Sequence, residues 1–458
     1  MSKKIILIVA GVLAILAVSF IVLTRGPSAE VELLQTPSGS AETRYLVFQI
    51  FTGTADPAIP LGGEAILSAL PTKASISSFV DNIASTIGTT GSEQQKLGFI
   101  LGPISFDYSD ADIRRMISDA FAIAEEKNIA VGFHIDDSMF WTKRTDLWNN
   151  PKNIEWTDWN GTTFPYRYVD WIQTTLPPQM CYNRPTIVSA VTREAKDVVG
   201  SSIAQGLAHL KSVNKEYLFA GVFAGWETHL ADYRYYVKMV PSIATLMDKD
   251  GAPKVRIGYC ALSNLGYSAA NPPANIDAAL DGVVRDFILL WAKNLNNAGI
   301  PKEKIYTHVA YIDEETYAKK YPLNAIERNL GISNPSYSAL GRHSPFSTAF
   351  NDYSRPGFST YPVEGMFDAI YRELANHPKT GWASSEGANV LPGADASADS
   401  SGINMETYLA RMFNHGATLV NIFAWGMGGD AFKNSNPFRI ATEGPEAIAA
   451  YRKFLNQQ

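Results

Sequence analysis

Cysteine is scarce in this chain of 458 residues, where only Cys181 and Cys260 occur. Two cysteines cannot build a cysteine-ligated metal cluster, and the seven histidines show no H-E-x-x-H spacing. We therefore expect no metal and no other cofactor. Cys260 lies in an apolar run, which favours a buried free thiol, and pairing with Cys181 in an oxidising compartment is the alternative.

Long basic runs are also absent, and the formal net charge is -6. A nucleic-acid partner is not expected, because phosphate binding needs a cationic surface. No G-x-S-x-G elbow occurs, and no glycine-rich phosphate turn follows an early strand-like run. These absences argue against a serine hydrolase of that type and against a dinucleotide-binding fold.

The N-terminus is a long apolar run. Lys3 and Lys4 precede Ile5–Leu23, 19 residues without a charge or a proline. That length just crosses a bilayer as a helix, so we expect residues 1–24 to be a signal anchor, with a cleaved signal peptide as the alternative. Both place the rest of the chain in the periplasm or outside the cell, since the lysines stay in the cytoplasm. Residues 25–43 then form a polar tether.

Short apolar runs alternate with helical patterns from Tyr45 onward, as in parallel strands joined by crossover helices. The helices are expected within 110–128, 186–210, 276–299, 363–377 and 404–416, where apolar residues recur at helical spacing. Asp110 is the expected N-cap of the first. The eight expected strands are 45–51, 97–103, 130–136, 218–225, 255–261, 305–312, 382–387 and 418–426.

Eight strands with intervening helices predict a (β/α)8 TIM barrel with long βα loops over residues 44–458. A doubly wound open sheet is the alternative. The segment between residues 311 and 362 fits the pattern least, and residues 344–350 could be a further strand.

Polar and aromatic side chains gather at the ends of the predicted strands, where a barrel of this kind carries its chemistry. Strand three ends with His134, Asp136, Asp137 and Trp141; strand four with Trp226, Glu227 and His229; strand five leads to Asn264. His308 and Tyr311 belong to strand six, Glu386 to strand seven and Trp425 to strand eight. Asp136 and Asp137 fit a loop turn as well as sugar binding, and the two histidines fit the core as well as a site.

The two glutamates suit glycosidic-bond hydrolysis. One carboxyl must protonate the leaving oxygen, and the second must attack the sugar or activate water. Glu227 and Glu386 end different strands that converge at one barrel mouth, so they can share a site. Trp226 beside Glu227 would raise the pKa of that carboxyl, as an acid catalyst requires.

A glutamate on strand four, a glutamate on strand seven and a tryptophan closing strand eight resemble the large clan of retaining (β/α)8 glycoside hydrolases. The resemblance implies that Glu227 is the acid/base, Glu386 the nucleophile and Trp425 the sugar platform. It also implies that Tyr311 orients the nucleophile. The chain departs from the clan in having Trp226 where most members have asparagine, and it fits no one family.

Two loops are rich in aromatic residues. Residues 140–182 contain Trp148, Trp156 and Trp159 among others, and residues 351–362 contain Arg355 and Tyr361. We expect both to wall the cleft that holds the glutamates and to contact an oligo- or polysaccharide, with a self-packed lid as the alternative for the first. An inverting glycosidase and a non-catalytic carbohydrate-binding barrel remain the competing functions.

Overall fold

The computed structural model describes residues 42–51, 70–169, 174–231, 255–310, 344–362, 366–378, 380–390, 403–423, 425–426 and 437–456. Residues Ser40–Gln458 form one compact unit. No helix in the described ranges is long and apolar enough to span a membrane. The predicted anchor, residues 1–24, lies outside those ranges, so it stays a prediction.

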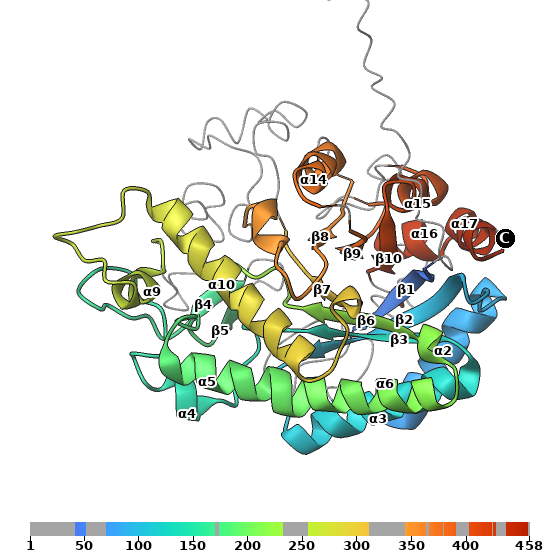
Figure 1. The fold of residues 1–458 in the computed structure, drawn as a ribbon, viewed down its shortest axis with the longest axis horizontal. Coiled ribbons are helices and arrows are strands. Elements are labelled where there is room, and N and C mark those ends of the chain that lie inside the picture. The colour runs from blue at the N-terminus through green and yellow to red at the C-terminus, as the bar shows by residue number, and fades with distance from the viewer. Residues whose placement is uncertain are drawn as a thin grey trace, which may run out of the picture. The chain divides into compact units, whose positions relative to one another are not determined.

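Eight parallel strands form a nearly closed barrel (Figure 1). Their order around the sheet is β7-β6-β3-β2-β1-β10-β9-β8. The two end strands of this order are joined by two isolated parallel bridges, Tyr306 to Arg355 and Val309 to Phe358. The strands are β1 (Arg44–Phe51), β2 (Gln95–Ile104), β3 (Ala130–Ile135), β6 (Phe219–Ala224), β7 (Ile305–Thr307), β8 (Gly357–Ser359), β9 (Trp382–Gly387) and β10 (Ala417–Ile422).

Strand alternation separates two cores. In β1, Leu46, Phe48 and Ile50 join the large apolar cluster that includes residues of the surrounding helices. Tyr45 and Val47 instead join a smaller cluster with residues of the other strands, which fills the inside of the barrel. Successive strand residues point to opposite faces, so Gln49 shares the inner face.

Helices follow most strands and cover the barrel, as the amphipathic spacing predicts. Ser109, and not Asp110, is the N-cap of the helix after β2, because its side chain accepts from Asp112 N at 3.2 Å. The helices are α2 (Lys73–Ile87), α3 (Asp110–Lys127), α4 (Thr145–Trp148), α5 (Pro185–Arg193), a π-helical continuation (Glu194–Gly200), α6 (Ser201–Ser212), α9 (Tyr259–Asn264), α10 (Ile276–Asn297), α14 (Met366–Ala375), α15 (Met405–Phe413), α16 (Pro437–Glu443) and α17 (Pro445–Leu455).

The predicted fifth strand is wrong. Residues 255–261 run instead into helix α9, whose first N–H groups at Cys260 and Ala261 donate to the buried carboxyl of Glu155. The fifth barrel strand is β7, and the sixth is β8, inside the segment predicted to be a loop. Residues 346–349 form a 3-10 helix rather than a strand.

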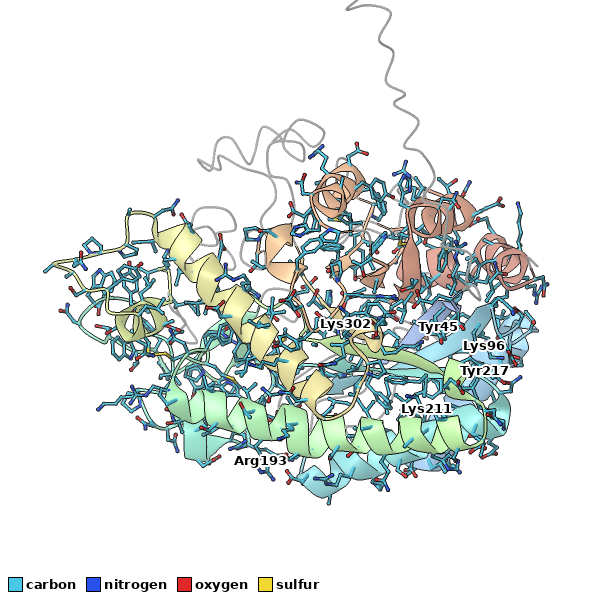
Figure 2. The ribbon with its side chains drawn as sticks, in the orientation of Figure 1. Tyr45, Lys96, Arg193, Lys211, Tyr217 and Lys302 are labelled. Carbon is cyan, nitrogen blue, oxygen red and sulfur yellow. A yellow bond between two sulfur atoms is a disulfide. The ribbon has the colours of Figure 1, made fainter. Side chains whose placement is uncertain are left out.

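Buried and half-buried cations and tyrosines cover the amino end of the barrel, where Figure 2 shows Tyr45, Lys96 and Tyr217. Tyr45 donates to the carbonyl of Tyr217, and Lys304 donates to the Tyr45 hydroxyl. Arg355 also belongs to this end, because it pairs with Glu42 just before β1 and binds Thr418 near the start of β10. The expectation that Arg355 contacts a substrate beside the glutamates is therefore wrong.

A candidate active site at the carboxyl ends of the strands

Glu227 occupies a strained turn after β6. Its backbone φ is +50°, in the left-handed region that residues other than glycine rarely adopt. Asp137 holds the turn, because it accepts from the Thr228 hydroxyl and from Trp226 N. Gly225 is required beside it, since a Cβ there would lie 2.6 Å from Thr228 Oγ1. The turn directs Glu227 into the site with 7% of its surface exposed.

Glu386 belongs to β9 and is 6% exposed. The Tyr361 hydroxyl donates to its Oε1 at 2.8 Å. Burial, followed by the nearby charge of Glu386, holds the pKa of Tyr361 well above its usual range, so the tyrosine remains a donor. A phenol that donates to a carboxyl stabilises the ionised form of that carboxyl.

Tyr361 occupies the position that the sequence prediction assigned to Tyr311. That assignment counted residues 305–312 as strand six, but β7 is the fifth strand, and Tyr311 lies outside the described residues. Tyr361 follows the sixth strand, β8, and was predicted only as a loop contact. The residue-351–362 loop is therefore split between the two ends of the barrel by β8.

His134 and His308 form a buried pair that lies close to Glu386 and reaches Glu227 through Ser359. His134 Nε2 lies 2.9 Å from His308 Nδ1, and His308 Nε2 lies 2.8 Å from Ser359 Oγ. Ser359 Oγ lies 2.9 Å from Glu227 Oε1 and can donate to it when the carboxyl is ionised. Both rings are fully buried. Burial lowers the pKa of His308 to about 4 and that of His134 well below its usual range, so both are neutral.

His134, His308 and Glu386 also bring one potential ligand atom each to within 4.8 Å of one another. This is the set of described residues that could hold a metal ion. Every ring nitrogen of the two histidines already has a hydrogen-bond partner, since His134 Nδ1 contacts Gln49 Oε1 at 3.1 Å. The arrangement fits a hydrogen-bonded chain, and we assign no metal to it.

Aromatic rings line part of the same region. Trp226 stacks on His134 with the ring centroids 4.1 Å apart, and Phe423 meets Trp226 edge-on at 6.5 Å. Trp226 is 8% exposed and Phe423 is 9% exposed. Phe423 was not predicted as a site residue, although it directly follows β10, two residues before Trp425.

Several predicted substrate contacts are buried or lie outside the barrel strands. Trp141 is fully buried with its indole donating to Pro178 O, and Trp425 is 2% exposed with its indole donating to Asn82. Both belong to the large apolar cluster. Asn264 follows no barrel strand, since it ends α9 and binds Asn183.

Asp136 and Asp137 are 1% exposed and act on the backbone. Asp136 accepts from Met139 N and Phe140 N, so it caps the loop after β3, and Asp137 holds the Glu227 turn. Burial raises the pKa of Asp137 to about 7, and the neighbouring Asp136 contributes to that rise. The turn interpretation fits both residues better than sugar binding.

The aromatic segment after β3 packs on itself and on α9. It contains α4 and the hairpin of β4 (Arg167–Val169) and β5 (Thr174–Leu176), grouped with α9 in Figure 1. A disulfide joins Cys181 in this segment to Cys260 in α9, so the expected free thiol is wrong. The Tyr182 hydroxyl donates to His229 O, which connects the segment to the Glu227 turn.

Gln49 and Asn421 were missed by the sequence analysis. Each is a fully buried polar residue within an apolar strand, and Asn421 Nδ2 donates to Gln49 Oε1 at 2.8 Å. An amide on the inner face of such a strand was the available signal, because a buried polar group needs a partner.

An open hollow of about 740 Å³ over α2, lined by Ser78 and Asp81 among others, contains none of the predicted site residues.

No family model matches the chain, and no curated protein matches it. Solved structures of barrel enzymes, glycoside hydrolases among them, do match. The catalytic domain of a beta-amylase from Paenibacillus polymyxa matches with 8% identity over 90% of this chain and 98% of its own, at a TM-score of 0.48. A broad-specificity endoglucanase from Bacteroides salanitronis matches with 10% identity over 91% and 93%, at 0.40.

A D-psicose 3-epimerase is also similar, with 11% identity over 83% of this chain and 94% of its own, at a TM-score of 0.32. Every one of these TM-scores is below 0.5. The likenesses therefore carry no argument about what this chain does.

Proposed function

We propose that this protein is a retaining glycoside hydrolase that acts outside the cytoplasm, with Glu227 as acid/base and Glu386 as nucleophile. The observation that carries the proposal is a pair of buried carboxyls on the fourth and seventh barrel strands with different hydrogen-bond surroundings. Glu386 faces the phenol of Tyr361, and Glu227 faces a serine bound to a neutral histidine. Two carboxyls whose surroundings differ in this way suit the two roles of a glycosidase.

In the first step, Glu227 gives its proton to the leaving oxygen while a Glu386 oxygen bonds to the anomeric carbon and the glycosidic bond breaks. In the second step, Glu227 takes a proton from water, the water oxygen bonds to the same carbon, and the ester to Glu386 breaks. Two inversions leave the anomeric configuration unchanged. We assign Trp226 and Phe423, whose rings meet edge-on, as the aromatic surfaces for a sugar ring.

The location outside the cytoplasm rests on two observations. One is the apolar run of residues 5–23 behind two lysines. The other is the Cys181–Cys260 disulfide, which would be reduced in a typical cytosol.

The test starts with a screen of aryl glycosides on a fragment beginning near Ala41, to find a sugar that is cleaved. Glu227→Gln should then retain first-step activity on a dinitrophenyl glycoside and stall as a covalent intermediate, because that leaving group needs no proton. Azide should release a glycosyl azide of unchanged configuration from this variant. Glu386→Gly should instead give the inverted azide.

Ser354→Ala is the matched control, because Ser354 is a buried serine that binds Asn351 on the amino side of β8. It should behave as the wild type. A wild-type product of inverted configuration would replace the retaining assignment with an inverting one. Sugar binding without cleavage of any substrate in the screen would favour the non-catalytic carbohydrate-binding barrel.

A further inference from the structure

A continuous chain of buried hydrogen bonds leads from the β9 backbone to Glu227. Asn421 Nδ2 lies 2.7 Å from Ser385 O and 2.8 Å from Gln49 Oε1. Gln49 Oε1 lies 3.1 Å from His134 Nδ1, and the chain continues through His308 and Ser359 to the carboxyl. We call this chain, Asn421–Gln49–His134–His308–Ser359, the relay. All five of its members are at most 3% exposed.

The relay has a fixed direction at its backbone end. A carbonyl oxygen can only accept, so the Asn421 atom facing Ser385 O is the amide nitrogen. That nitrogen also donates to Gln49, which must therefore present its oxygen there. The same oxygen faces His134 Nδ1, so the hydrogen of His134 is on Nδ1.

The hydrogen on His134 Nδ1 determines which nitrogen of each neutral imidazole donates and which accepts. A neutral ring has one N–H, so His134 Nε2 accepts and His308 Nδ1 is the donor between the two rings. His308 Nε2 is then an acceptor as well, and it takes the hydroxyl hydrogen of Ser359. Full burial keeps both rings in this neutral form.

Ser359 has a single hydroxyl hydrogen. When His308 accepts that hydrogen, only lone pairs of Ser359 face Glu227 Oε1, at 2.9 Å. An ionised carboxylate would meet those lone pairs without a hydrogen between them, whereas a protonated carboxyl donates to them.

We propose that the relay holds Glu227 in its protonated form, which makes Ser359 and His308 positioning residues for the general acid. This inference rests on the proposed function and deepens it. The hydrogen bond to Glu386 has the opposite effect, because Tyr361 donates to this carboxyl and favours its ionised form. The two carboxyls are thus sorted into acid and nucleophile by the direction of the hydrogen bonds that reach them.

The relay also favours return of the proton. After Glu227 has protonated the leaving group, the Ser359 hydrogen can turn to the carboxylate, but His308 Nε2 then faces a hydroxyl oxygen without a hydrogen. No proton leaves the relay in this rearrangement. The contact between His308 Nε2 and Ser359 Oγ therefore lacks a hydrogen until Glu227 takes a proton from water in the second step. The titratable groups near Glu227 are His308 after β7, Tyr361 after β8, Glu386 on β9, Asp137 through the turn and His229 on the Glu227 carbonyl.

Nitrogen NMR of the ¹⁵N-histidine-labelled fragment tests the direction without any substrate. Both His134 and His308 should carry their hydrogen on Nδ1 and remain neutral across the range of stability, with His134→Gln and His308→Gln identifying the signals. A hydrogen on Nε2 of either ring would overturn the proposal. This readout stands even if no glycoside is cleaved, so its failure and that of the proposed function are distinguishable.

The alkaline limb of kcat/KM, on a glycoside with a poor leaving group, reports the pKa of the acid in the free enzyme. Ser359→Ala removes the acceptor for Glu227, and His308→Phe frees the serine hydrogen to bind the carboxylate. Each should move that limb down by roughly one pH unit, about tenfold in the acid constant. Ser359→Thr keeps the hydroxyl and should restore the wild-type limb. Ser354→Ala should leave it unchanged.

A purely structural role would lower the rate at every pH equally. An unchanged alkaline limb in both Ser359→Ala and His308→Phe, with the activity reduced or not, would therefore overturn the relay. Movement of the acidic limb alone would do the same, because that limb belongs to Glu386.

Discussion

The Tyr361 hydroxyl donates to Glu386, and the effect of this hydrogen bond can be tested at the level of a single atom. Tyr361→Phe keeps the ring and removes the donor to Oε1. We expect kcat/KM to fall by roughly 100-fold, as for other single donors to a developing or fixed negative charge. The acidic limb of the pH profile should move to higher pH, because the carboxylate loses a hydrogen bond that favours it.

Tyr451→Phe is the control for this change. Tyr451 is a fully buried tyrosine whose hydroxyl donates to Thr442 O, so the variant loses a buried hydroxyl elsewhere in the barrel. It should lower the melting temperature without moving either limb. An acidic limb unchanged in Tyr361→Phe would show that Tyr361 does not tune Glu386.

Glu155 provides a second test at the residue scale, this time on stability. Burial raises its pKa to about 8, and the carboxyl accepts from Cys260 N. An acid with a raised pKa binds more protons in the folded state, so its contribution is full below the unfolded pKa of about 4.5 and is lost as pH rises through about 8. The melting temperature should therefore fall across this window, and Glu155→Gln should flatten the fall.

Glu216→Gln is the matched change at an exposed glutamate in the 3-10 helix before β6. It should leave the slope of melting temperature against pH as in the wild type. Equal slopes in the wild type and in Glu155→Gln would mean that the Glu155 carboxyl is already ionised at pH 4.5 to 8 in the folded protein.

At the scale of elements, the strands that lie in longer apolar runs were predictable, the three-residue β7 in the run 305–312 included, and β8 was not. β2 and β10 are runs of apolar residues whose pattern identifies them directly. β8 has three residues between Pro356 and Thr360, too few for any periodicity to show. Residues 255–261 read as a strand because they are apolar, but a partner far away in the sequence, Glu155, binds the start of a helix there.

The two errors cancel for the site. One strand was counted too many after Glu227 and one too few before Glu386, so both glutamates kept their positions at strands four and seven. The tyrosine assignment lay between the two errors, and because Tyr311 lies outside the described residues, it stays a prediction. Gln49, Asn421 and Ser359 act through contacts made only when distant strands become neighbours, which local sequence patterns do not report.

The disulfide ties two βα segments and should matter for their stability. Cys181 and Cys260 are separated by 79 residues, a loop whose closure in the unfolded chain is worth about 2–4 kcal/mol. The double variant Cys181→Ser, Cys260→Ser should unfold at lower denaturant concentration than the oxidised wild type. The reduced wild type should match the double variant, which separates the loss of the bond from the loss of the sulfurs. Two titratable thiols in the untreated, unfolded protein would contradict the pairing.

At the scale of the whole molecule, the two ends of the barrel are specialised. The amino end is covered by Tyr45, Lys304 and the Arg355–Glu42 pair, and the carboxyl end carries the two glutamates. Because the two ends are separate, changes in the carboxyl-side loops can change which substrate binds without disturbing the packing at the amino end of the barrel.

The N-terminal run gives a prediction about where the whole molecule resides. Full-length protein should partition with membranes, and the fragment without residues 1–24 should be soluble, because residues 5–23 match the apolar thickness of a bilayer. Detergent extraction and sequencing of the N-terminus check this. Full-length expression that yields a soluble product starting near Glu30 would show that the run is a cleaved signal.

The left-handed backbone of Glu227 implies a conflict between the proposed activity and the stability of the fold. Asparagine and glycine adopt a φ of +50° far more readily than glutamate, whose strain there is of order 1–3 kcal/mol. Under selection for folding alone, position 227 should drift toward asparagine or glycine, and Glu227→Asn should melt above the wild type while hydrolysing nothing. The acid catalyst would then persist only in lineages where the reaction itself is under selection, and a heat-selected library would lose it first.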